Sequence, residues 1–202
     1  MPNSFFTDMT SSRFSPGALL DISGGGKVLV ISDFHMGGGR GDDLEYNGPL
    51  VTDILRDYYL KDDWNLILNG DIEELQRFSL ESIRRKWPEM YRIFDAFAEK
   101  GKLYKTLGNH DEALLFAKDY PYALYDAVRI ETALLPCYVY HGHQSSHIYA
   151  NYNHMIGAVL RYILKPFGIR NISSARSPYR RFFVERQAYE FSLRHRCISI
   201  IG

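Results

Sequence analysis

Residues 27–35 read KVLVISDFH, an apolar run of strand type that stops at an aspartate and a histidine. Three later segments repeat this plan, apolar residues first and polar residues last: NLILNGD (65–71), KLYKTLGNHD (102–111) and CYVYHGH (137–143). Helical patterns lie between them at residues 44–60, 79–98 and 112–118, and residues 127–135 indicate one further strand. Alternating helices and continuous apolar strands predict an α/β fold.

Composition divides the chain into four segments. Residues 1–23, punctuated by Ser, Thr, Pro and Gly, predict a loosely held arm, and residues 24–144 hold the strand clusters of a core. Residues 145–195 carry apolar residues at helical spacing and predict a basic helical cap inserted into that core. Residues 196–202 end in CISIIG and predict a buried strand that returns to the core.

Overall composition excludes several classes of protein. Hydrophobic residues make up 46% of the chain, which excludes global disorder, and no stretch approaches the length of an apolar membrane span. The N-terminal residues lack the basic and apolar regions of a secretory signal. Cys137 and Cys197 lie in apolar runs, which favours two buried thiols over a disulfide and predicts a cytoplasmic location.

The net charge of zero hides an asymmetry. Residues 151–202 contain nine Lys/Arg and two Asp/Glu, whereas residues 1–150 contain 15 Lys/Arg and 22 Asp/Glu. A basic segment of this kind predicts an anion-facing surface, and the alternative is a solvated, Arg-rich helical face.

Polar residues at the four strand ends form the candidate site. They are DxH (33–35), GDxxE (70–74), GNHD (108–111) and HGH (141–143). Each motif alone has a structural alternative, such as a turn or, for Asp71, a helix N-cap. Because functional groups gather outside the carboxyl ends of strands in α/β sheets, the four together predict one site. Carboxylate, amide and imidazole groups suit Mn, Fe, Zn or Mg better than a soft metal.

The ordered motifs resemble those of the calcineurin-like metallophosphoesterases. The resemblance implies a four-layer α-β-β-α sandwich and two divalent metal ions, with Mn as the first choice. It implies metal ligands at Asp33, His35, Asp71, Asn109 and His141, with Asp71 bridging both ions. It also implies that His110 is catalytic and is oriented by Asp111, with Glu74 behind the ligands.

Two sequence features bear on the substrate. The helical insertion resembles that of the UDP-2,3-diacylglucosamine pyrophosphohydrolase group, in which a cap receives acyl chains, although GNHD (108–111) stands where that group has GNRD. The resemblance implies an anionic phosphorylated substrate, with a phosphodiester or pyrophosphate bond favoured and a nucleotide-linked lipid as one candidate. A basic cap of this kind would also allow peripheral contact with a membrane. Candidate substrate contacts are Arg40, Glu74, His143, Arg176 and Arg180.

Three alternatives stay open at this stage. The HGHQ segment (141–144) supplies either His141 as the ligand, which we favour, or the start of a final GHxH motif, which fails at Ser145. The chain could be a nuclease whose basic segment follows the phosphates of nucleic acid, or a scaffold that keeps the fold without catalysis. CISIIG resembles the strand and glycine before that family's last two histidines, so the sequence predicts a chain truncated before its last strands.

Overall fold

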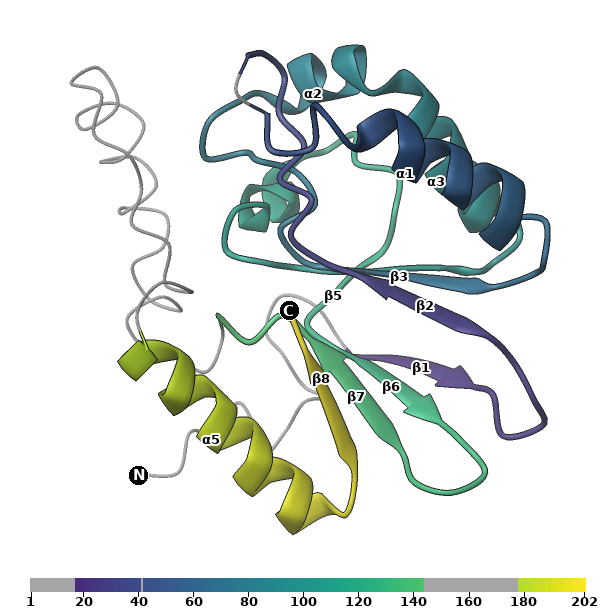
Figure 1. The fold of residues 1–202 in the computed structure, drawn as a ribbon, viewed down its shortest axis with the longest axis vertical. Coiled ribbons are helices and arrows are strands. Elements are labelled where there is room, and N and C mark those ends of the chain that lie inside the picture. Colours follow the sequence, from purple (N-terminus) through teal and green to yellow (C-terminus); the bar gives the residue numbers. More distant parts are fainter. Residues whose placement is uncertain (1–16, 41, 144–177) are drawn as a thin grey trace.

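The computed structural model describes residues 17–40, 42–143 and 178–202, with residues 178–183 described by their backbone alone. Within these residues the strands form two four-stranded sheets (Figure 1). The first sheet consists of β2 (Val28–Ile31), β3 (Asn65–Asn69), β4 (Leu103–Thr106) and β5 (Leu124–Tyr125). The second consists of β1 (Ala18–Asp21), β6 (Val128–Glu131), β7 (Cys137–Tyr140) and β8 (Ile198–Ile201). The fold is therefore α/β, as predicted.

The two sheets differ in strand direction. In the first sheet all neighbouring strands run parallel, with Val28 opposite Asn65 and Leu66 opposite Leu103. In the second, β1 runs parallel to β6, β6 antiparallel to β7, and β7 parallel to β8. The parallel order of the first sheet brings the ends of β2, β3 and β4 to one edge, where their polar motifs meet.

The helices differ in detail from the sequence pattern. They are α1 (Gly48–Ile54), the π-helix η2 (Leu55–Tyr59), α2 (Leu80–Lys86), α3 (Pro88–Glu99), the 3₁₀-helix η3 (Glu112–Phe116) and α5 (Pro178–His195). The single helix predicted over residues 79–98 is wrong, because Trp87 has φ −116° and ψ 47° and Pro88 starts a new helix. The helix predicted from residue 44 begins at Gly48 instead, since Asp42 accepts a hydrogen bond from Leu44 N and fixes a turn there.

Three hydrophobic clusters pack the helices and the two sheets together. Helix α3 packs its Met90, Phe94 and Phe97 against Leu66 and Leu68 on one face of the first sheet. A second cluster lies between the sheets and includes Ile67, Val128 and Val139. Helix α5 contributes Ala188 and Phe191 to a third cluster with Tyr140 of the second sheet. The complete four-layer sandwich stays a prediction.

The N-terminal segment departs from the prediction. The sequence predicts a loose arm over residues 1–23, but residues 18–21 form β1, paired with β6. Ala18 and Leu20 are buried and Leu19 is exposed, so the strand turns alternate side chains into the core. Residues 1–16 and 144–177 lie outside the described residues, and with them most of the predicted cap.

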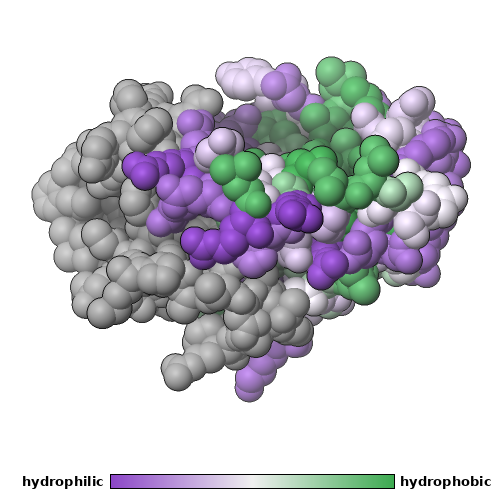
Figure 2. All heavy atoms as spheres, turned by 90° about the horizontal axis from the view of Figure 1, so that it is seen from below, coloured by the Kyte–Doolittle hydropathy of each residue, from purple (hydrophilic) through white to green (hydrophobic). Residues whose placement is uncertain are grey.

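The face formed by the second sheet and α5 is mixed in polarity. Figure 2 shows hydrophilic residues spread across this face, with hydrophobic residues exposed to solvent between them. Exposed apolar side chains include Leu193 on α5, Ile198 on β8 and Leu134 in the loop between β6 and β7. Among the described helices, none has the length and apolar character needed to cross a membrane. Cys137 and Cys197 are both free thiols, as predicted, but only Cys197 is buried, whereas Cys137 is partly exposed.

Candidate metal centre

Two groups of possible metal ligands meet at the carboxyl ends of the strands. His35, Asp71 and His110 form one group, and Asp33, Asp71 and His141 form the other. Within each group the ligand atoms lie within 4.8 Å of one another. Asp71 belongs to both groups, which is the arrangement that a carboxylate shared by two cations requires.

Asp71 is the central carboxylate of the site and is only 3% exposed. Its Oδ1 accepts a hydrogen bond of 2.8 Å from His110 N, and its Oδ2 lies 3.3 Å from His141 Nε2 and 4.0 Å from His35 Nε2. No helix follows it, so Asp71 is not the N-cap that its motif alone could have indicated. Asp71 therefore contacts or lies near histidines from three different segments of the chain.

Gly108 permits the two central loops to approach each other. A Cβ at this position would lie 2.1 Å from Asp71 Oδ1 and 2.4 Å from Asp71 N. No side chain fits at such distances without moving the backbone of Asp71. Gly108 therefore sets how closely the GNHD loop lies against Asp71.

The backbone of the site is strained. Asp33, His35 and Asp71 have φ of 56°, 46° and 52°, in the left-handed region that side chains seldom adopt. Hydrogen bonds compensate, since Asp33 N donates to Gly70 O at 3.2 Å and His35 N donates to Asp71 O at 2.9 Å. Positive φ at three candidate ligands is the clustering expected of a functional site.

The charges of the site are strongly coupled. Burial opposes ionisation of Asp71, but His141 and His110 hold the pKa of its carboxyl far below the usual range. Burial also opposes protonation of His35 and His141, yet the neighbouring carboxylates raise the pKa of His35 to about 10 and that of His141 to about 9. Without metal, these imidazolium groups neutralise part of the negative charge that metal ions would otherwise balance.

Glu74 holds the histidine that the sequence predicts to be catalytic. His110 Nδ1 lies 2.8 Å from Glu74 Oε2, and His35 Nδ1 lies 3.6 Å from the same oxygen. Glu74 is 4% exposed and faces the two histidines, and its contact with substrate stays a prediction. Burial opposes its ionisation, but both histidines lower the pKa of Glu74 to about 2.

Asp111 does not orient His110 as the resemblance implied. Its fully buried carboxylate accepts hydrogen bonds from Gly108 N at 2.6 Å and Ile72 N at 3.1 Å, and it contacts the ammonium of Lys105. The loop turns this side chain inward, beneath the site. The prediction of a catalytic Asp111 gives way to a structural contact with two backbone amides.

Sequence reasoning missed the group of buried charges around Lys105. Lys105 is fully buried on β4, and its Nζ lies 3.2 Å from Glu73 Oε2. Burial opposes its charge, but Asp111 and Glu73 raise the pKa of Lys105 above its ordinary value. The available signal was a lysine inside the apolar run KLYKTL (102–107), where only a buried partner could retain it.

The glycine loop after the first motif is tied down. Trp87 Nε1 donates to Gly37 O at 3.1 Å and to Asp42 Oδ2 at 2.8 Å, and Lys86 Nζ donates to Gly39 O at 2.8 Å. These bonds hold the loop against the end of α2. Arg40 follows this loop and is exposed.

The other predicted site residues differ in how much of their surroundings the structure describes. His143 lies with its ring centroid 5.5 Å from that of His141, and burial lowers the pKa of His143 to about 3. Asn109 lies in the GNHD loop, where its carbonyl accepts a hydrogen bond from Gln76 Nε2 at 3.0 Å. Arg176 lies outside the described residues, and Arg180 lies on α5 where only the backbone is described.

Gly202 lies at the same site. Gly202 N donates to Tyr140 O at 3.3 Å, and a Cβ on this glycine would lie 2.4 Å from Ser32 Oγ and 2.8 Å from His141 Nδ1. The predicted histidines after CISIIG stay a prediction.

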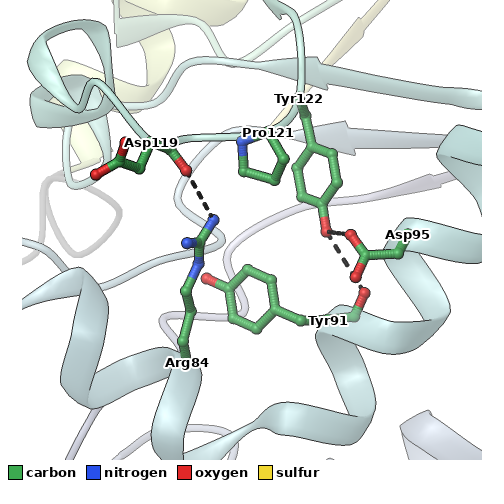
Figure 3. Close-up of a pocket in the computed structure, with 6 residues that line it drawn as sticks. All are labelled: Arg84, Tyr91, Asp95, Asp119, Pro121 and Tyr122. Atoms are coloured by element: carbon green, nitrogen blue, oxygen red, sulfur yellow. Dashed lines mark hydrogen bonds between the residues drawn. The ribbon is translucent and has the colours of Figure 1, made fainter.

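A separate pocket of about 340 Å³ contains none of the predicted site residues (Figure 3). It is lined by Arg84, Tyr91, Asp95, Asp119, Pro121 and Tyr122. Arg84 donates to the carbonyl of Asp119 at 3.4 Å, and Tyr122 donates to Asp95 at 2.8 Å. This pocket lies by α2 and α3, apart from the ligand groups.

Comparisons with known proteins give little beyond the geometry. No protein-family model and no curated protein matches the chain. Among solved structures, one match is a conserved uncharacterized protein, a predicted phosphoesterase, from Streptococcus pneumoniae TIGR4. The two are 17% identical with a TM-score of 0.29, and the match covers 65% of this chain and 53% of that one. The chain therefore spans about half the length of that protein, and we infer function from the residues of the site.

Proposed function

We propose that this protein is a metal-dependent phosphohydrolase that cleaves a phosphodiester or pyrophosphate bond. The observation that carries the proposal is the sharing of Asp71 between two groups of ligands, one with His35 and His110 and the other with Asp33 and His141. The resemblance of the four motifs to calcineurin-like metallophosphoesterases supports the same reaction class.

The residues fit two divalent ions. Carboxylate and imidazole donors converge, since His35 Nε2 lies 3.6 Å from Asp33 Oδ1 and 4.0 Å from Asp71 Oδ2. From the two groups, Asp33, His35, Asp71 and His141 would hold the ions, and the resemblance adds Asn109. His110, the remaining member, is assigned to proton transfer below. Mn²⁺ is the first choice and Fe, Zn or Mg are alternatives. What the ions would supply is Lewis acidity toward water and neutralisation of phosphoryl charge.

His110 is suited to handle a proton. Its Nδ1 is bonded to Glu74, so the proton on Nδ1 is held there and Nε2 is left for exchange with a reacting oxygen. In the protonated state, Nε2 can donate to the leaving oxygen as the phosphorus–oxygen bond breaks. Glu74 keeps the ring in one orientation, which is the function that the sequence assigns to Asp111.

The substrate class we propose is an anionic phosphorylated compound, of which a nucleotide-linked lipid is one candidate. Arg40 is the described cation nearest in sequence to the first motif, and its exposed side chain follows a fixed loop. A cation presented from a fixed loop would orient a second charged group of the substrate.

The test is hydrolysis of bis-p-nitrophenyl phosphate with added Mn²⁺ and with chelator. We expect Mn²⁺-dependent turnover that falls at least about 100-fold in Asp71→Asn and in His110→Ala. Asp63→Asn is a matched control, because Asp63 also has a positive φ (61°) but pairs with Lys102 away from the site. Turnover that survives the chelator, or an undiminished Asp71→Asn, would contradict the proposal.

A further inference from the structure

Lys105 occupies a position that the fold would fill with an apolar side chain. On β4, Leu103 packs against the cluster under the helices, whereas Tyr104 packs between the sheets. The two-residue period of a strand places Lys105 on the helix side with Leu103, and it is fully buried there. A buried ammonium costs free energy that a leucine would not, so its retention needs a reason other than packing.

The two partners of Lys105 are both fully buried carboxylates. Its Nζ contacts Asp111 and lies 3.2 Å from Glu73 Oε2. Glu73 Oε1 accepts hydrogen bonds from Tyr91 OH at 3.1 Å and Tyr120 OH at 2.9 Å. Glu73 therefore connects the ammonium to Tyr91 of α3 and to Tyr120 of the loop before β5. A shift of the ammonium would disturb both hydrogen bonds to Glu73.

Asp111 connects Lys105 to the loops of the site. Its carboxylate bonds Gly108 N, next to Asn109, and Ile72 N, next to Asp71. It is one side chain joined to both central motifs by main-chain amides. The first motif is joined as well, because Met36 N donates to Ile72 O at 2.8 Å and Glu74 N donates to Met36 O at 3.0 Å.

We propose that Lys105 is a positioning residue that sets the spacing of the Asp71 and GNHD loops by holding Asp111 against both. This rests on the proposed function and names a residue that the motifs do not contain. The ammonium contacts the Asp111 carboxylate and keeps it directed at the two amides. Without that contact, the carboxylate is free to turn away from the two amides, and the two loops separate.

The experiment measures Mn²⁺ affinity of the full chain by electron paramagnetic resonance of the free ion. We expect Lys105→Met to bind Mn²⁺ at least about 10-fold more weakly, as for other residues that orient metal ligands. Lys102→Met is the matched control, since it removes an ammonium next to β4 that pairs with Asp63 far from the loops. The Mn²⁺ affinity of Lys102→Met should lie within about 2-fold of that of the wild type. In hydrolysis assays at saturating Mn²⁺, Lys105→Met should lower kcat more than it raises KM.

A second variant addresses folding. Lys105→Met leaves Asp111 and Glu73 unpaired, so Lys105→Met/Glu73→Gln is measured beside it, because this pair of changes preserves the net buried charge. The double variant should fold and still bind Mn²⁺ weakly. Wild-type affinity in either folded variant overturns the positioning proposal, as does failure of both to fold, which would make Lys105 a residue of the core alone. Absence of Mn²⁺ binding by the wild type itself would instead overturn the proposed function.

Discussion

The two sheets contribute to the site in different ways. The first sheet supplies Asp33, His35, Asp71 and His110, and its loops are cross-linked by the buried polar contacts of Asp111 and Glu74. The second sheet supplies His141 alone among the ligand groups of the described residues. Its outer strand β8 is half-exposed, with Ile198 at 50%, and the sheet depends on apolar contacts with α5.

This difference separates two kinds of stability. Polar contacts to backbone amides fix positions closely but tolerate little change in geometry, because each bond depends on distance and direction. Apolar contacts tolerate small shifts and mainly contribute free energy of folding. Changes to the polar contacts of the first sheet's site loops should therefore alter the site, and changes to apolar contacts with α5 should alter stability.

The largest expected effect comes from Gly108→Ala. A Cβ would meet Asp71 at 2.1 Å, so the substitution should cost about 3 kcal/mol of unfolding free energy and abolish Mn²⁺ binding. Urea denaturation and Mn²⁺ titration measure the two effects. Gly24→Ala is the control, because a Cβ there meets nothing within 4 Å. Normal Mn²⁺ binding by Gly108→Ala would show that the loops are less rigid than we describe.

His141 links the two sheets electrostatically, and pH should break that link. Its pKa is raised from 6.5 to about 9, so its contribution to stability is complete below 6.5 and is lost as pH rises through 9. Metal-free protein should therefore lose about 3 kcal/mol of unfolding free energy between about pH 6 and pH 9.5. Urea midpoints in chelator measure this loss, and His141→Gln should reduce it. An equal loss in that variant would assign the effect to other groups.

Phe191→Leu tests the apolar side of the comparison. Phe191 is 6% exposed, and its ring centroid lies 5.4 Å from that of Tyr138 and 6.5 Å from that of Tyr140. Loss of these ring contacts should cost about 1.5 kcal/mol of unfolding free energy while Mn²⁺ affinity stays close to that of the wild type. A large fall in Mn²⁺ affinity would mean that α5 positions His141.

Ser79→Ala should give the smallest effect. The Ser79 hydroxyl accepts a hydrogen bond from Ser82 N at 3.2 Å and caps α2. Its loss should cost about 1 kcal/mol without changing Mn²⁺ affinity, and thermal unfolding measures it. Ser79→Asn, which can restore the cap, should recover most of that stability.

Much of the first sheet could be predicted from sequence because its signals are local. Each strand is a short apolar run that ends in polar residues. The break between α2 and α3 was missed, although Pro88 marks it. The strand β1 was missed because ALLD (18–21) is too short for its alternation to stand out from a polar segment. It is stabilised by pairing with β6, more than a hundred residues away in sequence.

The partners of the charged residues could not be predicted in the same way. Asp111 follows His110 directly, which favoured a contact between them, but the loop turns one side chain into the core and leaves the other near Asp71. Glu74 reaches His110 across 36 residues of sequence, and Lys105 meets Glu73 across 32. Pairings of that kind depend on how the loops pack, which no local pattern records.

The positive φ angles of Asp33, His35 and Asp71 cost stability, so selection for stability alone would favour other residues at these positions. Glycine at Asp33, whose side chain is 48% exposed, would relax the backbone by about 1 kcal/mol and remove little packing. A laboratory screen that rewards heat resistance alone should therefore enrich substitutions at these positions and discard the site in doing so. Under the proposed function, metal binding by Asp33 and His35 is what would oppose such substitutions.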